Sequence, residues 1–307
     1  MGHGPKAWLA RTLTRWLTVE KPADCTPLCD FERIRYEIRP GDVLLVEGRT
    51  RVSDVIKTIT QSPWTHSALY LGRIGDIDDP RVREHVAYCY DGDGNAQLVV
   101  EAVLGRGTII SSLEKYQHDH LRICRPGGLS RRDAQSVIAY AVNHLGCDYD
   151  VRQLLDLARF LFPYGILPRR WRSSLFEHNA GFPTRTVCSS MIAAAFNHVH
   201  FPVLPVLRRL ENGELRLYKR NARLYTPRDF DYSPYFEIIK YPYLGIEDKR
   251  LYRKLPWDEE GQICNGENDC FIPRPVPNSL AGADPSRALP PAIVDGIGLP
   301  GPLSNKD

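Results

Sequence analysis

Four short apolar runs precede the longest helical patterns in this chain, and that order constrains the fold more than any other feature. The runs are GDVLLVEG, HSALYLG, AQLVVEAVLG and LRICRP, at residues 41–48, 66–72, 96–105 and 121–126. Each has the length of a strand and is bounded by Gly, Pro or polar residues, so each predicts a buried strand. Strands that come before the main helices predict an α+β domain.

Two of the helical patterns have clear sequence signals. RVSDVIKTIT (51–60) lies between the first two predicted strands. SRRDAQSVIAYAVNHLG (130–146) begins with Ser130 as the capping residue and has Asp133 three residues later, which is a capping box. Gly146 is the predicted stop of that helix.

A third helix is predicted in TRTVCSSMIAAAF (184–196), where the Ala-rich run favours helix. With Thr186 as N-cap, Cys188 lies in the first turn, where the helix dipole favours a thiolate. The alternative is a small buried residue that fills space, because free Cys is among the most buried residue types. The helix alone leaves both interpretations open.

His66 and Glu101 stand out in two of the predicted strands. Glu101 lies within LVVEAV, where a carboxylate without a partner would carry a large desolvation cost. A salt bridge, for example to an Arg, or an outward-facing position would account for Glu101 alone, and a hydrogen bond at the strand end would account for His66. Together they supply a base and an orienting carboxylate, which nucleophilic cysteine catalysis requires.

The composition excludes several classes of protein. The chain has 307 residues, 43% of them hydrophobic and 25% charged, which is enough for one large or two small globular domains. The net charge of +3 and the lack of a recognition motif argue against a nucleic-acid partner. No apolar run has the length of a membrane span. The N-terminus is not typical of a signal peptide, and eight cysteines do not make a dense disulfide framework, so we predict a cytoplasmic protein.

The sequence predicts three parts. Residues 1–32 form an N-terminal amphipathic helix and linker, 33–245 the main domain, and 246–307 an extended, largely disordered Pro-rich tail. The basic, Trp-containing N-terminal helix either docks on the body or lies on a membrane surface. The apolar segment 151–185 is either a helical hairpin in or over the core, or a lid or lipid-facing element.

The sequence predicts no metal site and no cofactor. Two cysteine pairs are spaced more widely than the ligands of a zinc knuckle, although zinc remains an alternative there, and two histidine pairs lack a carboxylate or cysteine at ligand spacing. These pairs are Cys25/Cys29, Cys264/Cys270, His118/His120 and His198/His200. We predict surface positions for the histidines. DGDGNA (91–96) lacks the Gly and Glu that a calcium loop needs and predicts a hairpin turn.

Five motifs in order carry a resemblance to a known family. RPGDVLLVEG, SPWTHSALYLG, VVEAV, GCDYD and TVCSSMIAAAF follow one another over residues 33–240. This set resembles the permuted papain-like amidases, bacterial relatives of the NlpC-like cysteine hydrolases, in which the His strand comes before the Cys helix. The resemblance implies a circularly permuted papain-like fold, with a mainly antiparallel sheet packed against helices.

The resemblance also implies the roles of particular residues. Cys188 is the expected nucleophile, His66 the general base and Glu101 the group that orients His66, while Tyr149 and Ser189 are expected to line the site. The expected activity is cleavage of an amide or ester through a Cys acyl-enzyme, without a cofactor, on a small-molecule, peptide or acyl-lipid substrate. An acyltransferase and a non-enzymatic lipid-binding module are the alternatives. We expect a location in the cytoplasm, with peripheral contact at the inner membrane surface.

Overall fold

The computed structural model describes residues 19, 27–103, 106–149, 185–186, 188–242, 255–258, 260–266 and 269–272. The chain divides into two compact units, Met1–Leu255 and Pro256–Asp307. The predicted N-terminal helix, nearly all of the 151–185 segment and most of the predicted tail lie outside the described residues. Within the described residues, no helix combines the length and the apolar character needed to cross a bilayer.

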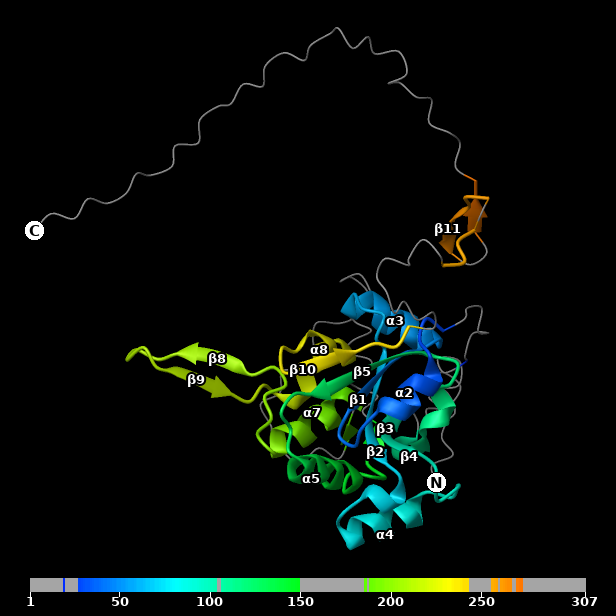
Figure 1. Cartoon of the computed structure of the whole chain (residues 1–307). Helices are drawn as coiled ribbons and strands as arrows, with labels where there is room; N and C mark the ends of the chain where they lie inside the picture. The colour runs from blue at the N-terminus through cyan, green and yellow to red at the C-terminus, as the bar shows by residue number, and fades with distance from the viewer. Residues whose placement is uncertain are drawn as a thin grey trace, which may run out of the picture. The chain divides into compact units, whose positions relative to one another are not determined.

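A six-stranded sheet organises the first unit, in the order β10-β5-β1-β2-β3-β4 (Figure 1). Its strands are β1 (Val43–Glu47), β2 (His66–Gly72), β3 (Leu98–Val103), β4 (Gly107–Ser112), β5 (His120–Pro126) and β10 (Phe236–Ile239). Every neighbouring pair in this sheet is antiparallel. The prediction of an α+β domain with a mainly antiparallel sheet is confirmed.

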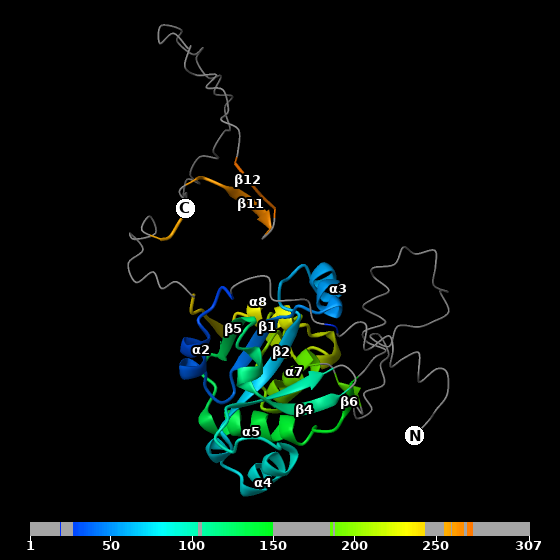
Figure 2. The same cartoon turned by 90° about the vertical axis from the view of Figure 1, so that its right-hand side faces the viewer.

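Helices cover both faces of this sheet. They are α2 (Phe31–Glu37), α3 (Arg51–Thr60), α4 (Pro80–Cys89), α5 (Arg131–Val142), α7 (Cys188–His198) and α8 (Pro227–Tyr232), with the 3-10 turns η1 (Ile74–Asp76), η2 (Leu113–Tyr116) and η4 (Ala222–Leu224). One core cluster joins α5 and α7 to the central strands, and a second joins α2 and η2 to the other face. Helices α4 and α5 contact each other at one end of the body (Figure 2).

Strand β1 shows how the sequence separates these two clusters. Val43 and Leu45 belong to the cluster with α7, whereas Leu44 and Val46 belong to the cluster with α2. Successive side chains of a strand point to opposite faces, so a strand that is covered on both faces needs an uninterrupted apolar run. The run VLLV meets that need, and all four side chains are buried.

The capping prediction for α5 is confirmed at its start and wrong at its end. Ser130 accepts a hydrogen bond from the Asp133 N–H, as a capping residue does. The helix ends at Val142, before Gly146. The ring of His144 donates to the Tyr140 carbonyl at 2.7 Å, so a side chain satisfies one of the last carbonyls and the chain turns earlier.

Residues 91–96 do not form a hairpin turn. They join α4 to β3, because residues 80–89 form a helix that the apolar pattern does not reveal. Asp79 accepts from the Arg81 N–H at the start of that helix, and Pro80 occupies its first position. These two residues are the sequence signal that predicts α4.

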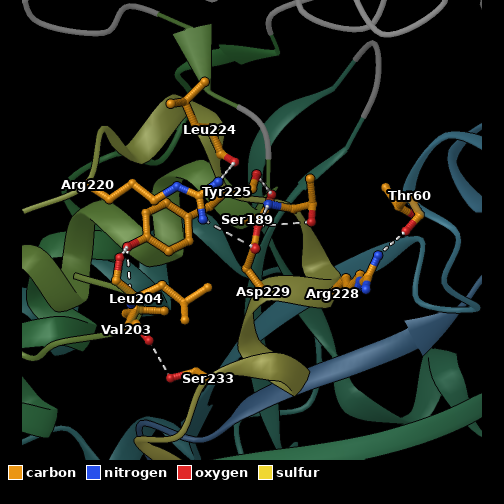
Figure 3. Close-up of polar contacts among 11 residues, drawn as sticks. Thr60, Ser189, Val203, Leu204, Arg220, Leu224, Tyr225, Arg228, Asp229 and Ser233 are labelled. Atoms are coloured by element: carbon orange, nitrogen blue, oxygen red, sulfur yellow. Dashed lines mark hydrogen bonds and ion pairs between the residues drawn. The ribbon is translucent and has the colours of Figure 1, made fainter. Parts of the chain in front are cut away.

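Polar contacts fix the chain that follows α7 (Figure 3). Ser189 donates from its hydroxyl to the Tyr225 carbonyl at 2.7 Å. The Tyr225 hydroxyl donates to the Leu204 carbonyl at 3.2 Å. Arg220 pairs with Asp229 at 3.5 Å. Segments that are far apart in sequence are therefore tied to α7 and to one another.

A second, smaller hairpin stands apart from the main sheet. Its strands are β8 (Val206–Arg209) and β9 (Leu215–Tyr218), and every residue of both strands is exposed. In Figure 1 the hairpin extends away from the body of the first unit.

The second unit contains a short two-stranded ribbon. Its strands are β11 (Ile263–Gly266) and β12 (Asp269–Phe271), and a disulfide joins Cys264 to Cys270. Because these two sulfurs are bonded to each other, the pair does not supply thiolate ligands for zinc.

Candidate active site

His66 is the first residue of β2 and lies opposite Val46 of β1. Because the strand begins here, the ring lies at the end of the sheet, and 22% of its side chain is exposed. Its Nε2 donates a hydrogen bond to Oε2 of Glu101 at 2.8 Å. An ionised carboxylate only accepts hydrogen bonds, so Nε2 carries the proton and Nδ1 remains for another partner.

Glu101 lies on β3, next to β2, and its side chain is 1% exposed. Three donors surround its carboxylate: His66, the Tyr116 hydroxyl at 2.6 Å from Oε2, and the Lys115 ammonium at Oε1. Burial alone would raise the pKa of Glu101, but the hydrogen bond and charge of His66 and the charge of Lys115 lower the pKa well below its usual range. Glu101 is therefore a buried carboxylate with a full set of partners.

Lys115 and Tyr116 are residues that sequence reasoning missed. Both belong to η2, the turn that follows β4, and Ser112 caps that turn. Tyr116 is buried, and burial together with the charge of Glu101 raises its pKa well above the usual value, so it stays a hydrogen-bond donor. The sequence predicts a partner for Glu101, for example an Arg; the structure supplies a Lys, a Tyr and a His instead.

Cys188 is the first residue of α7, and its side chain is buried. Thr186, the predicted N-cap, belongs instead to the short strand β7 (Arg185–Thr186), so the helix begins one residue later than predicted. Pairing of β7 with β6 (Asp148–Tyr149) extends the chain up to this point. The prediction that Cys188 lies in the first turn of a helix is confirmed.

The Cys188 thiol interacts with His66 and Ser67. It shares a side-chain hydrogen bond with the His66 ring, and the Ser67 backbone also hydrogen-bonds the sulfur. The Ser67 hydroxyl is buried and has no hydrogen-bond partner in the described part of the chain, and Ser67 helps to lower the pKa of Cys188. Since Nε2 of His66 is held by Glu101, Nδ1 is the ring nitrogen left for the sulfur.

The electrostatics of this cluster favour an ion pair. Burial alone would raise the pKa of Cys188, but the charge and hydrogen bond of His66 lower it, with help from Ser67. Burial alone would lower the pKa of His66, but the charge of Cys188, its hydrogen bond to the ring and the contact with Glu101 raise it to about 10. A thiolate beside an imidazolium is the state that a cysteine nucleophile needs.

The two predicted lining residues have different positions. Tyr149 pairs in parallel with Thr186, which brings its backbone beside the segment that leads into α7. Ser189 is 1% exposed, and its hydroxyl is used by the Tyr225 carbonyl. The Ser189 side chain therefore connects α7 to the chain at Tyr225.

His120 does not fit the prediction of a surface residue. It is partly buried and stacks on Trp64 with ring centroids 5.4 Å apart. Burial lowers its pKa, which favours the neutral ring. His118, His198 and His200 are exposed, as predicted. Among the described residues, no group of three or more His, Cys, Asp or Glu side chains is arranged to hold a metal ion.

Comparison with known proteins finds a similarity to one family over part of the chain. Residues 37–159 match the model of the family Peptidase_C92, described as permuted papain-like amidase enzyme, YaeF/YiiX, C92 family. The matched range contains His66 and Glu101 and ends before Cys188. The predicted resemblance to the permuted papain-like amidases and the predicted fold class are confirmed, and the family consists of amidase enzymes.

One solved structure is also similar. It is titled "Crystal structure of metalloprotein yiiX from Escherichia coli O157:H7, DUF1105", shares 15% sequence identity, covers 67% of this chain and 98% of its own, and has a TM-score of 0.42. No curated protein matches the chain.

Proposed function

We propose that this chain is a thiol hydrolase that cleaves an amide or ester bond through an acyl-enzyme on Cys188. The observation that carries the proposal is the continuous contact from Cys188 through His66 to the buried Glu101. A packed cysteine at a helix start would not need a charged ring beside it, and a structural histidine would not need a buried carboxylate held by three donors. The family match, to amidase enzymes, supports the same chemistry.

Each step of the reaction has a group to perform it. Cys188 transfers its proton to His66, and the thiolate attacks the carbonyl carbon of the substrate. The backbone N–H of Cys188 lies in the first turn of α7, where backbone N–H groups have no partner within the helix, so it is placed to donate to the developing oxyanion. His66 then returns the proton to the leaving amine or alcohol, and water attacks the thioester with His66 again as base.

Glu101 keeps the ring of His66 in one orientation during these steps. Its hydrogen bond to Nε2 fixes the tautomer, and its charge stabilises the imidazolium. Tyr116 and Lys115 hold the carboxylate in turn.

The proposal is tested by trapping the acyl-enzyme. The purified full-length chain is incubated with matched amide and ester substrates, including acylated peptides and acyl-lipids, and each cysteine-containing peptide is examined by mass spectrometry. We expect the acyl group on Cys188 and not on the exposed Cys89. Acyl transfer to other cysteines, or turnover that is unchanged in Cys188→Ala, would contradict the proposal.

Product analysis separates hydrolysis from acyl transfer. The same reaction is run with and without an added amine or alcohol acceptor. Free acid in both reactions supports the hydrolase, because water then resolves the thioester. Acylated acceptor as the main product would identify an acyltransferase that uses the same nucleophile.

A further inference from the structure

The hairpin β8–β9 has two features that are unfavourable in water. Leu207 lies opposite Leu217, and these two leucines and Leu215 share one face and are 60–61% exposed. Arg209 lies at the edge of this face, opposite Leu215. On the other face Arg208 lies directly opposite Arg216. Like charges opposite each other destabilise an antiparallel pair, and an isolated two-stranded hairpin is at best marginally stable.

The base of the hairpin is nevertheless fixed to the body. On the β8 side, the Leu204 carbonyl and N–H both bond to the Tyr225 hydroxyl, and the Val203 carbonyl accepts from Ser233. On the β9 side, Arg220 pairs with Asp229 and donates to the Leu224 carbonyl. Figure 3 shows these contacts around Tyr225. An anchored base with an exposed end is the arrangement of a docking element.

The charges of the hairpin select the kind of surface that it fits. Residues 206–220 contain five basic residues and two acidic ones. Within the described residues, Arg208 contacts the ring of Tyr218, and no acidic partner is found for Arg208 or Arg209. Arg216 lies 3.9 Å from Glu214 in an exposed ion pair, which is weak in water. An anionic surface would remove the repulsion between Arg208 and Arg216. The exposed leucines would also be stabilised by contact with an apolar medium.

We propose that the hairpin β8–β9 docks this protein on an anionic lipid bilayer. The leucine face enters the boundary of the acyl chains, and the arginines reach the phosphates of the headgroups, since long basic side chains keep their charge at the interface while their stems lie on apolar surface. Nucleic acid would satisfy the arginines but not the leucines. A second copy of the chain, paired through the leucines, would bury the apolar face and leave the arginines opposed.

The test uses the full-length chain and vesicles of phosphatidylcholine with or without phosphatidylglycerol. We expect co-sedimentation with the anionic vesicles and weaker binding at high salt, because screening acts on exposed charges. The double variant Leu215→Ser/Leu217→Ser and the variant Arg208→Glu should each lower the partition coefficient by at least about tenfold. Hydrogen exchange of the β8–β9 amides should slow when anionic vesicles are added.

The matched controls lie on α4. Tyr88 is 90% exposed and the Arg81 side chain 92% exposed, so Tyr88→Ser and Arg81→Glu remove the same kinds of group elsewhere and should bind as the parent does. Size-exclusion chromatography and thermal unfolding check that the variants fold. The proposal fails if the parent does not bind anionic vesicles, if the hairpin variants bind like the parent, or if the leucine variants change self-association instead of vesicle binding.

Discussion

Two regions of the first unit differ in how their charged groups are paired. At the start of β2, the buried carboxylate of Glu101 accepts hydrogen bonds from three side chains: the His66 ring, the Lys115 ammonium and the Tyr116 hydroxyl. On the hairpin β8–β9, like charges face each other and leucines face solvent. The first arrangement buries its charge among internal partners. The second leaves its charges on the surface, where, in the part of the chain that the structure describes, Arg216 has only an exposed ion pair with Glu214 and Arg208 only the ring of Tyr218.

This difference indicates what each region does. A buried cluster whose partners are all internal is held in one geometry, which chemistry on a bound acyl group requires. The hairpin β8–β9 keeps opposed arginines and exposed leucines, so binding to a surface that pairs the charges and covers the leucines would stabilise it. Catalysis and docking should therefore be separable by substitution, and the predictions below test that separation.

Cys188→Ala should have the largest effect, because it removes the only atom that can form the acyl-enzyme in the proposed reaction. We expect turnover to fall to the level of the uncatalysed reaction, while anionic vesicle binding stays at the parent level. Turnover and co-sedimentation are measured on the same preparation. The control is Cys89→Ala, which removes an exposed cysteine at the end of α4 and should leave both unchanged. Loss of vesicle binding in Cys188→Ala would couple the two regions and break the comparison.

The sequence predicts this site because its main elements are local. The runs around His66 and Glu101 have strand signals, and the helix that begins at Cys188 has an Ala-rich pattern. Lys115 and Tyr116 could not be predicted in the same way, since they follow β4 in a short 3-10 turn with no periodicity. The pairing of β3 with β4 places the start of that turn beside Leu98, and the turn itself must fold back to reach Glu101. A Glu in a buried strand indicates that a partner is needed, but the strand sequence does not indicate which residue is that partner.

The hairpin was missed for a related reason. Sequence patterns predict strands from burial, but both faces of this hairpin are exposed: VLRR does not alternate, and LRLY is only four residues long. His120 was misplaced because spacing along the chain carries no information about the Trp64 ring that it stacks on. Contacts made across the fold, rather than within one element, account for these errors.

Glu101→Gln should have the next largest effect. Loss of its charge lowers the pKa of His66, so the imidazolium half of the ion pair is lost at a lower pH than in the parent. We expect kcat/KM to fall by about 10²- to 10⁴-fold. In the parent, the alkaline limb of the pH profile should follow His66 near its raised pKa of about 10, and in the variant it should move to lower pH. A profile with unchanged limbs would show that Glu101 does not act on His66.

Tyr116→Phe should lower stability more than it lowers the rate. The phenol donates to a buried carboxylate, and hydrogen bonds to charged groups contribute about 1.5–3 kcal/mol. Urea unfolding at neutral pH measures the loss. Because the pKa of Glu101 is lowered in the folded state, its contribution is present above its unfolded pKa and is lost as the pH falls toward the folded value. The difference between Tyr116→Phe and parent should therefore shrink in acid; a constant difference would mean that the phenol acts through packing alone.

Lys115→Met should shift the alkaline limb of the pH profile in the opposite direction to Glu101→Gln, and by less. The ammonium partly neutralises Glu101, so its removal leaves more negative charge for His66 and raises the pKa of the ring. The alkaline limb of the profile should move to higher pH. The Lys115 side chain is 41% exposed, and solvent screens the interaction, so the shift should be smaller than in Glu101→Gln. A shift in the same direction for both variants would contradict the charge argument.

Arg216→Thr should have the smallest effect of these variants. It should stabilise the free hairpin and weaken its binding to vesicles. Removing one of two opposed arginines relieves a repulsion of about 0.2–1 kcal/mol, and threonine suits a strand, so the β8–β9 amides should exchange more slowly in the free protein. Binding to phosphatidylglycerol vesicles should weaken at the same time, because one headgroup contact is lost. Tyr218→Ser is the counterpart on the same face: it removes the ring beneath Arg208 and should speed exchange. If Arg216→Thr instead strengthens vesicle binding, the opposed arginines do not serve to bind an anionic surface. The contrast between the buried cluster and the hairpin must then be explained without a bilayer.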